Sequence, residues 1–484
     1  MKHTPLYIDN ETRNATGNAV FERRSPVTGE VLTQAAAAST QDAIASIESA
    51  QRALLSWSKT GPGQRRMLLS KAADEIEKRT EDFVAAMKAE VGAGELWARF
   101  NVMMAANLFR EAASMTTQIQ GSTIPSDKPG TLSMTVRQPV GVVLSIVPWN
   151  GPVVLAARAI AYPLMCGNTV VFRASETSPK THALVAESVH AAGFPAGTLN
   201  FLTNDPKDAP EVIEAMIAHP AVRRVNFTGS TSVGRIIGEK CGRHLKRCIL
   251  ELGDKSPMVV LEDADIDGAV NATIFGAFLY QGQICMTTER VVVDESIADV
   301  FVEKLAARAA QLQPGDPRSQ AACALGPLIS QGAANRLNGL LEDAVSKGAT
   351  IRSGGQADAT LMAATVLDGV TSDMKIYSDE AFGPILQVIR VNGADEAVKV
   401  ANDTDYGLSA AVFGTDMTRA LDVAMRLDTG SVHINGSTVA NEAQAPYGGT
   451  KSSGWGRFDS QAVIDEFTEL KWLTIEHPHQ QYPL

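Results

Sequence analysis

The run VGVVLSIVPW, residues 140–149, is apolar at nearly every position and does not alternate between apolar and polar side chains. Such a run is typical of a β-strand buried on both faces, as strands are in parallel sheets. Further apolar runs follow, separated by segments of helical pattern: NTVVFRA (168–174), TLNFLT (198–203) and RRVNFTGS (223–230). This spacing predicts a parallel sheet built from successive βαβ units.

Amphipathic helices are expected before this region. Apolar residues recur at helical spacing over Ser39–Ser58 and again over Leu68–Val91, which predicts two long helices. Apolar and polar residues then alternate over Thr131–Arg137, as in a half-buried strand of a hairpin or sheet extension.

A second α/β region is expected from residue 256 to residue 449. Its apolar runs are MVVL (258–261), RVVV (290–293) and ILQVIRV (385–391), and the chain closes on the apolar-rich ELKWLTI (469–475). The order of elements predicts an α/β protein with a strand near its carboxyl end.

The composition limits the classes of function. The chain has 484 residues, 45% of them apolar, which is enough for two or three domains. Lys and Arg number 43 against 54 Asp and Glu, a formal charge of −11, and no Lys/Arg run occurs, so no nucleic-acid partner is expected. Because the sequence has neither a signal-peptide pattern nor about 18 consecutive apolar residues, we expect a cytoplasmic protein without membrane contact.

Five cysteines, an odd number without a CxxC pair, favour neither a disulfide framework nor a thiolate metal site, so no metal is expected. One of them, Cys285, lies in the polar segment YQGQICMTTER. A cysteine in an intracellular protein is either a nucleophile or, more often, a small buried side chain. None of the histidines lies in a recognisable motif that would supply a base.

Two other segments suggest chemistry. FTGSTSVG (227–234) has the pattern of a strand, a turn and a helix, in which Gly229 permits close backbone approach and Ser230 offers a hydroxyl where a helix N-terminus favours phosphate. Helix capping alone gives the same pattern. Glu251 ends an apolar strand, where burial raises a carboxyl pKa and suits a general base. The alternative is a surface glutamate, or one paired with Lys255.

A series of short motifs follows a fixed order along the chain. They are PWN (148–150), CGNTVVFRASE (166–176), FTGSTSVG (227–234), ELGDKSP (251–257), GQIC (282–285), DEAFGP (379–384), YGLSAAVF (406–413) and PYGGTKSSGWGR (446–457). None is specific alone. Together they resemble the aldehyde dehydrogenase superfamily over nearly the whole chain, and within it the members that oxidise salicylaldehyde in bacterial naphthalene degradation.

The resemblance implies an α/β fold with a Rossmann-like cofactor domain over residues 1–120 and 140–252 and an α/β catalytic domain over 253–449. Residues 121–139 and 465–484 would form a small β oligomerisation element. Since exposed apolar strands need a partner, a homodimer or homotetramer is expected.

The resemblance also implies the roles of three residues. Cys285 would attack the aldehyde carbon, and the side-chain amide of Asn150 and the backbone N–H of Cys285 would donate to the resulting oxyanion. After hydride transfer leaves a thioester on Cys285, Glu251 would activate the water that hydrolyses it.

NAD is the implied cofactor. Glu176 would accept hydrogen bonds from the adenosine ribose, where its carboxylate repels the 2′-phosphate of NADP. Ser230, beside Gly229, would contact the pyrophosphate, and Glu380 and Phe382 would hold the nicotinamide end. The other residues expected to bind the cofactor are Pro148, Trp149 and Arg173.

Three positions depart from the family pattern. Arg173 and Ala174 replace Lys-Pro, so a guanidinium near the ribose could tolerate NADP. Asp254 replaces a glycine beside the expected base, where it is either solvent-facing and inert or shifts the pKa of Glu251. Phe458 replaces a glutamate, which we interpret as a structural change.

The expected substrate is a small aromatic aldehyde. Gly151 stands where family members often carry a bulky aromatic residue, which leaves space beside Asn150. Arg158, with Trp97 and Tyr447 as aromatic walls, would favour a planar aldehyde with a polar ring substituent, such as the ortho-hydroxyl of salicylaldehyde. The alternative is that Arg158 forms a salt bridge at a domain or subunit surface.

Three competing functions remain at this point. In a coenzyme A-acylating dehydrogenase the thioester passes to a thiol, against which the presence of Glu251 speaks. A redox-independent thiol esterase would use Cys285 and Glu251 without a cofactor. A catalytically inactive scaffold would keep only the fold.

Overall fold

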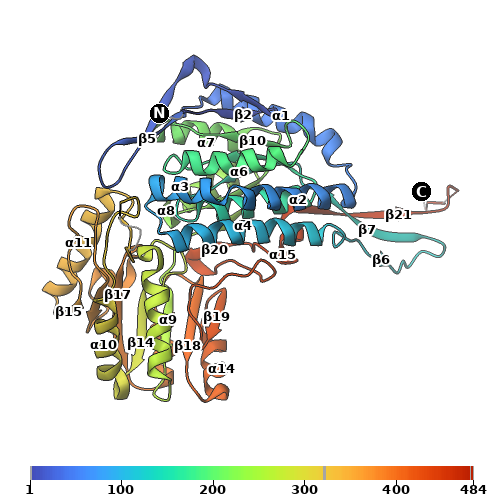
Figure 1. The fold of residues 1–484 in the computed structure, drawn as a ribbon. Coiled ribbons are helices and arrows are strands. Elements are labelled where there is room, and N and C mark those ends of the chain that lie inside the picture. Colours follow the sequence, from blue (N-terminus) through green and yellow to red (C-terminus); the bar gives the residue numbers. More distant parts are fainter. Residues whose placement is uncertain (1–2, 320–322, 480, 483–484) are drawn as a thin grey trace.

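Two large sheets covered by helices, a small three-stranded sheet and a projecting β arm make up the described part of the chain, residues 3–319, 323–479 and 481–482 of a computed structural model (Figure 1). The α/β fold class predicted from the apolar runs is therefore confirmed. None of the helices in these ranges is long and apolar enough to cross a membrane.

The first sheet has eight strands in the order β20-β12-β11-β8-β9-β10-β2-β3. Its five central strands run parallel, and each of the predicted apolar runs before residue 230 forms one of them. The short strands at the two edges are antiparallel. The strands are β2 (Leu6–Ile8), β3 (Glu11–Arg13), β8 (Val142–Ile146), β9 (Thr169–Arg173), β10 (Leu199–Leu202), β11 (Val222–Thr228), β12 (Arg247–Glu251) and β20 (Gly454–Trp455).

The helices before the sheet differ from the prediction. The first expected helix is α1 (Thr40–Trp57), but the single helix expected over Leu68–Val91 is wrong, because two helices, α2 (Pro62–Lys78) and α3 (Thr80–Val91), meet at Arg79. Arg79 is not helical (φ −101°, ψ 19°), and Glu81 and Asp82 follow in the first turn of α3, where acidic residues favour a helix N-terminus. The periodicity could not show the break, since both helices present apolar faces to the same core.

The first 36 residues also form strands that no pattern predicted. They contribute β2 and β3 and a separate small sheet of β1 (His3–Thr4), β5 (Val31–Ala36) and β4 (Val20–Arg24). The remaining helices of this body are α4 (Glu95–Met115), α5 (Pro152–Met165), α6 (Pro179–Ala191), α7 (Ala209–Ala218) and α8 (Thr231–Arg243).

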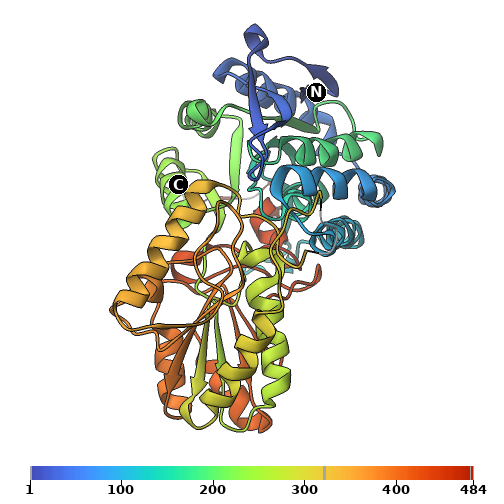
Figure 2. The same cartoon turned by 60° about the vertical axis from the view of Figure 1, so that its left-hand side comes forward.

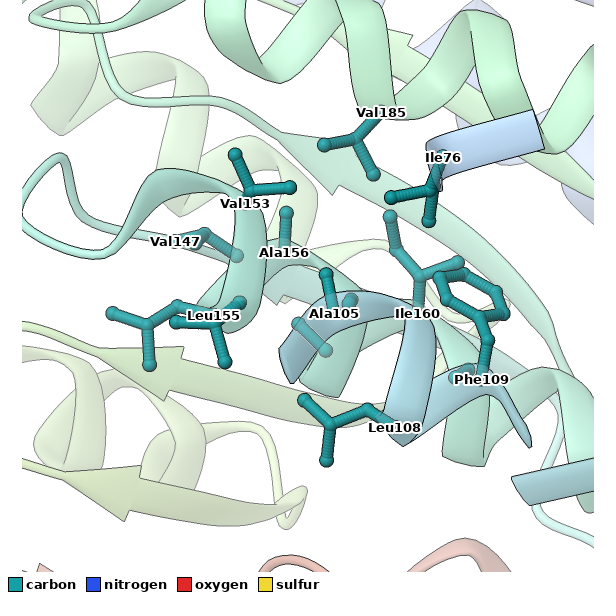
Figure 3. Packing of buried hydrophobic residues seen from close by; sticks show 14 of the residues in the cluster. Ile76, Ala105, Leu108, Phe109, Val147, Val153, Leu155, Ala156, Ile160 and Val185 are labelled. Atoms are coloured by element: carbon teal, nitrogen blue, oxygen red, sulfur yellow. The ribbon is translucent and has the colours of Figure 1, made fainter. Parts of the chain in front are cut away.

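Helix α5 lies in the middle of the main core, and all of its residues are buried. Figure 3 shows Ile160 of α5 packed near Ile76 of α2 and Phe109 of α4, with Val185 of α6 beyond them. Burying each such side chain contributes about 1.5–3 kcal/mol. Because α5 begins directly after Asn150 and Gly151, this packing fixes the position of both residues.

The second sheet has seven strands in the order β15-β16-β17-β14-β13-β18-β19, parallel except at the β15 edge. Figure 2 shows this body with helices beside its strands. The strands are β13 (Pro257–Val260), β14 (Arg290–Asp294), β15 (Thr350–Ser353), β16 (Thr365–Asp368), β17 (Ile385–Val391), β18 (Ser409–Phe413) and β19 (Ser431–Ile434). The helices of this body are α9 (Ile266–Phe278), α10 (Glu295–Ala309), α11 (Gln331–Ser346), α12 (Lys375–Ser378), α13 (Ala394–Asn402) and α14 (Met417–Arg426).

The arm joins two segments that are far apart in the sequence. β21 (Thr468–Ile475), which follows α15 (Ala462–Phe467), pairs antiparallel with β7 (Leu132–Pro139), and β6 (Thr123–Ile124) lies on the other side of β7. The strands predicted over 131–137 and 469–475 are both confirmed. In Figure 1 the arm extends beyond both bodies.

Candidate active site

Three neighbouring strands of the first sheet end at the same edge. β8, β11 and β12 lie side by side and run parallel, so their carboxyl ends meet. Asn150 follows β8, Ser230 follows β11, and Glu251 is the last residue of β12. The sheet topology thus assembles an amide, a helix N-terminus and a carboxyl group at one place.

Cys285 reaches this place from the second body through a strained turn. Helix α9 ends in a short 3-10 turn (Leu279–Gly282), in which Tyr280 and Gln281 have φ values of 51° and 44°, in the left-handed region. Side-chain bonds hold the turn: the Tyr280 hydroxyl donates to the Val91 carbonyl (3.0 Å), and the Gln281 amide bonds the loop at residues 326 and 327. Non-glycine residues in this region cost about 1 kcal/mol or more each, and such strain often marks functional sites.

Two cavities meet at Cys285. A larger one, of about 880 Å³, extends along the carboxyl edge of the first sheet, and a smaller one, of about 350 Å³, lies between α4, α5 and α9. Cys285 and Asn150 belong to the lining of both. Trp97 anchors this junction, because its indole N–H donates to the Asn150 carbonyl (2.9 Å).

Cys285, Tyr447 and Glu251 form a hydrogen-bonded group. The Tyr447 hydroxyl lies 3.0 Å from Cys285 Sγ and 3.2 Å from Glu251 Oε1. Burial raises the pKa of Glu251. Burial also raises the pKa of the Cys285 thiol, and the nearby Glu251 carboxylate raises that pKa further. The thiol is therefore protonated at rest, and a buried base stands beside it. The alternative of a surface glutamate is wrong, since Glu251 is only 1% exposed.

Arg158 lies beneath the Tyr447 ring, with its guanidinium carbon 4.2 Å from the ring centroid. It forms two bonds to Asp459, Nε to Oδ1 at 3.2 Å and Nη2 to Oδ2 at 3.0 Å. Both residues are buried. The expected alternative, a salt bridge, is thus present, but it lies in the interior rather than at a surface. Arg158 still lines the smaller cavity, together with Trp97, Gly151 and Tyr447.

The residues expected to bind a cofactor fall into two groups. The first group lines the larger cavity: Pro148, Trp149, Gly229, Ser230, Glu380 and Phe382. Arg173 and Glu176 are not part of that lining. Instead Arg173 Nε donates to Asn204 (2.8 Å) and Nη2 pairs with Glu176 (3.2 Å), so the two predicted residues neutralise each other.

A buried ion pair positions the loop that carries Glu380 and Phe382. Lys255 pairs with Glu289 (2.5 Å), not with Glu251, and Glu289 also accepts the backbone N–H groups of Ala381 and Phe382, both at 2.8 Å. Burial and the nearby Glu289 carboxylate raise the pKa of Glu380 to about 8. Phe382 meets Trp149 edge-on, with the ring centroids 5.9 Å apart.

Asp254 is buried, which excludes the solvent-facing alternative. Its carboxylate accepts the backbone N–H groups of Leu408 and Ser409, each at 3.0 Å, and a bond from the Ser256 hydroxyl. It therefore ties the end of β12 to β18. Its charge adds to the rise in the pKa of Glu251, after the larger effect of burial.

Several lining residues had no sequence signal of their own. Asp459 lies 301 positions from Arg158, and nothing near it indicates a partner. On α9 an apolar stripe predicts core packing rather than a cavity wall. Among the residues missed are Arg235, Arg336 and Tyr406 in the larger cavity and Phe100, Phe275 and Leu279 in the smaller.

Comparison with known proteins gives consistent matches. The protein-family model described as "Aldehyde dehydrogenase family" matches residues 12–473 of the sequence. Salicylaldehyde dehydrogenase of Pseudomonas putida is 58% identical over 480 residues, which cover 99% of each chain. Vanillin dehydrogenase of Pseudomonas sp. (strain HR199 / DSM 7063) is 52% identical, covering 100% of each chain. The crystal structure of a salicylaldehyde dehydrogenase from Pseudomonas putida G7, complexed with salicylaldehyde, has a TM-score of 0.99 at 57% identity, with 100% of both chains covered.

Proposed function

Because the chain belongs to the aldehyde dehydrogenase family, we propose that it oxidises aromatic aldehydes, salicylaldehyde among them, to carboxylic acids with NAD as the electron acceptor. The observation that carries the proposal is that one thiol, Cys285, lies where two cavities of different character meet. A dehydrogenase needs this arrangement, since the aldehyde carbon on the thiol must also face the hydride acceptor.

The larger cavity suits a dinucleotide. The N-terminus of α8 opens into it at Ser230, and Thr231, Ser232 and Arg235 add hydroxyls and a cation, a donor set that fits a pyrophosphate. At Gly229 a Cβ atom would come within 2.6 Å of the Phe227 ring, so only glycine allows the backbone to pass this close to the ring. The family uses nicotinamide cofactors, and a bound nicotinamide supplies the hydride acceptor.

The choice of NAD over NADP follows the expectation for Glu176. We propose that its carboxylate contacts the adenosine ribose and disfavours a 2′-phosphate. Because Arg173 pairs with Glu176, the negative charge there is partly neutralised, and the discrimination should be weaker than a free carboxylate would give.

The smaller cavity suits an aromatic ring. Most of its lining is apolar, with Trp97, Phe100 and Phe275 among its walls. Gly151 lines this cavity without a side chain, and a Cβ there would lie 3.1 Å from Val154 Cγ1, closer than ordinary van der Waals contact. Its volume, about 350 Å³, lies within the range of small-molecule sites.

The proposed chemistry assigns one task to each group. The Cys285 thiolate attacks the aldehyde carbon, and the Asn150 side-chain amide and the Cys285 backbone N–H donate to the oxyanion. Such a donor typically contributes about 10²–10³ in rate. Once the thioester has formed on Cys285, Glu251 removes a proton from the water that attacks it, and the carboxylic acid leaves.

We also propose the domain assignment and assembly that accompany this function. Residues 1–120 and 140–252 bind the cofactor, 253–449 carry Cys285, and 121–139 with 465–484 join subunits in a homodimer or homotetramer. Exposed side chains on β21 support the last point, with Leu470 58%, Trp472 69% and Ile475 60% exposed. Light scattering should give a multiple of the 51.4 kDa chain mass; a monomer would contradict this assembly.

Growth of NADH absorbance tests the function. With NAD and salicylaldehyde, benzaldehyde or hexanal, the unmodified protein should form NADH fastest with the aromatic aldehydes, and Cys285→Ala should form none. Cys323→Ala is the matched control, because this half-buried thiol lines neither cavity. If hexanal is oxidised as well as the aromatic aldehydes, the substrate assignment fails.

The role of Glu251 needs a second measurement. In Glu251→Gln the steady-state rate should fall more than the single-turnover rate of NADH formation, because thioester hydrolysis depends on this base. Equal losses in both rates would contradict this division. Hydrolysis of an activated ester without NAD reduction in the unmodified protein would instead indicate a thiol esterase.

A further inference from the structure

The Tyr447 hydroxyl lies between the nucleophile and the base. It is 3.0 Å from Cys285 Sγ and 3.2 Å from Glu251 Oε1, so a single oxygen touches both groups. A tyrosine hydroxyl has one proton to donate and lone pairs with which to accept. It can therefore accept from the thiol while it donates to the carboxylate, which makes a continuous chain from S–H through O–H to the carboxylate oxygen.

The surroundings hold Tyr447 in this position. Its backbone N–H and carbonyl exchange bonds with Phe458 at 2.8 and 2.7 Å. Its ring rests on the Arg158 guanidinium, which Asp459 fixes by two bonds. A side chain that served only as a wall of the aldehyde cavity would need its ring but not a directed hydroxyl.

The nucleophile must lose its proton before it can attack. Burial and the Glu251 carboxylate raise the pKa of the Cys285 thiol, yet only the thiolate attacks a carbonyl carbon effectively. The charged groups that face this cluster are Arg158 from α5, Asp254 after β12 and Asp459 after β20. Each carboxylate among them is bonded elsewhere, so Glu251 is the acceptor next to the hydroxyl.

On the premise that the chain oxidises aldehydes as proposed above, we propose that Tyr447 is a catalytic proton bridge. As Cys285 Sγ bonds to the aldehyde carbon, the thiol proton passes to the Tyr447 oxygen and the phenolic proton passes to Glu251 Oε1. One proton moves in total from thiol to carboxylate, and the π electron pair of the C=O bond moves to the aldehyde oxygen. Glu251 then releases this proton to solvent before it acts as the base for hydrolysis. Tyr447 is neutral before and after the step, and the electron pair of the broken S–H bond forms the new S–C bond.

Tyr447→Phe removes the hydroxyl and keeps the ring. It therefore distinguishes a role in proton transfer from a role as part of the cavity wall. The first measurement is the rate of Cys285 alkylation by iodoacetamide from about pH 6 to about pH 10, with no aldehyde or cofactor present. Peptide mass spectrometry follows Cys285 apart from the other cysteines. Tyr7→Phe is the matched control, because it removes a hydroxyl that bonds Glu187, outside both cavities.

We expect alkylation in Tyr447→Phe to be about tenfold slower near pH 7, since loss of a hydrogen bond to a charged group has about this effect. The profile should lie about one pH unit to higher pH than that of the unmodified protein over the whole range, because the pKa of the Cys285 thiol is raised well above its usual value. Tyr7→Phe should follow the unmodified protein throughout. A Tyr447→Phe profile that coincides with the unmodified one overturns the proposal.

Single-turnover kinetics complete the test. In Tyr447→Phe the single-turnover rate of NADH formation should fall as much as the steady-state rate, while KM for the aldehyde stays within about twofold. In Glu251→Gln, which removes the acceptor of the same proton, both rates should fall, and the steady-state rate should fall further because thioester hydrolysis also loses its base. A normal single-turnover rate, or a change confined to KM, overturns the bridge. Failure of the proposed function can be distinguished from failure of the bridge. In the first case the unmodified protein would form no NADH, but the alkylation profiles of the unmodified protein and Tyr447→Phe could still be compared.

Discussion

Breaking the ion pair between Arg158 and Asp459 should reveal its contribution through pH. The perturbation is Arg158→Leu, which keeps an aliphatic side chain in place of the guanidinium and leaves the fully buried Asp459 carboxylate without a cation. Burial raises the pKa of Asp459 to about 6 even with Arg158 present. Without Arg158 the pKa of this carboxyl in the folded protein must rise further.

The sign and size of the effect follow from that pKa. A carboxyl whose pKa is higher in the folded than in the unfolded state stabilises the fold at low pH, and this stability is lost as the pH rises through the folded pKa. The unmodified protein stops losing stability from Asp459 above about pH 6, whereas the variant continues to lose about 1.4 kcal/mol per pH unit. The difference in the free energy of unfolding between the two proteins reaches about 3 kcal/mol at pH 8. This is the lower end of the 3–5 kcal/mol expected for breaking a buried ion pair.

The assay is thermal unfolding followed by fluorescence near pH 5 and pH 8. For a chain of this length the unfolding entropy is about 1 kcal/mol per kelvin, so we expect Tm to fall by about 3 °C at pH 8 and by about 1 °C or less at pH 5. Arg158→Leu/Asp459→Asn should recover most of the loss, because Asn accepts the positive φ of 60° found at Asp459. Equal losses at both pH values, or no recovery in the double variant, would refute this account and indicate lost packing instead.

Other perturbations address the neighbouring groups. Asp254→Asn removes a charge that raises the pKa of Glu251, so the acidic limb of the kcat profile should move to lower pH; an unmoved limb would contradict the coupling. Glu289→Gln weakens the acceptor of the Phe382 N–H and should raise the Kd for NAD about tenfold, measured by fluorescence titration. Arg173→Leu frees the Glu176 carboxylate and should raise the ratio of kcat/KM for NAD over NADP about tenfold, whereas an unchanged ratio would place Glu176 away from the ribose.

The parallel strands were predictable because their signal is local. Strands β8 and β9 are runs dominated by apolar residues and are buried at every position, and burial on both faces is what such runs indicate. The end of β12 at Glu251 was predictable from the apolar residues that precede this glutamate. The break between α2 and α3 was not predictable, since the residues on either side of Arg79 keep the same apolar spacing.

Contacts between distant segments account for most of what the sequence could not show. The partner of Arg158 is 301 positions away, and the backbone bonds to Asp254 come from Leu408 and Ser409 at the start of β18. Tyr447 was predicted as an aromatic wall, and it does line the smaller cavity. That its hydroxyl also touches both Cys285 and Glu251 depends on three segments meeting, which no local pattern encodes.

The segment from Tyr447 to Asp459 has a consequence for the order in which the enzyme can mature. It returns from the second body to the first, adds β20 beside β12 and supplies both Tyr447 and the partner of Arg158. On the ribosome, Asn150, Glu251 and Cys285 are all made well before this segment appears. A nascent or truncated chain therefore carries the Cys285 thiol without its hydroxyl neighbour, and the hydrogen-bonded group of Cys285, Tyr447 and Glu251 is complete only when synthesis is nearly finished.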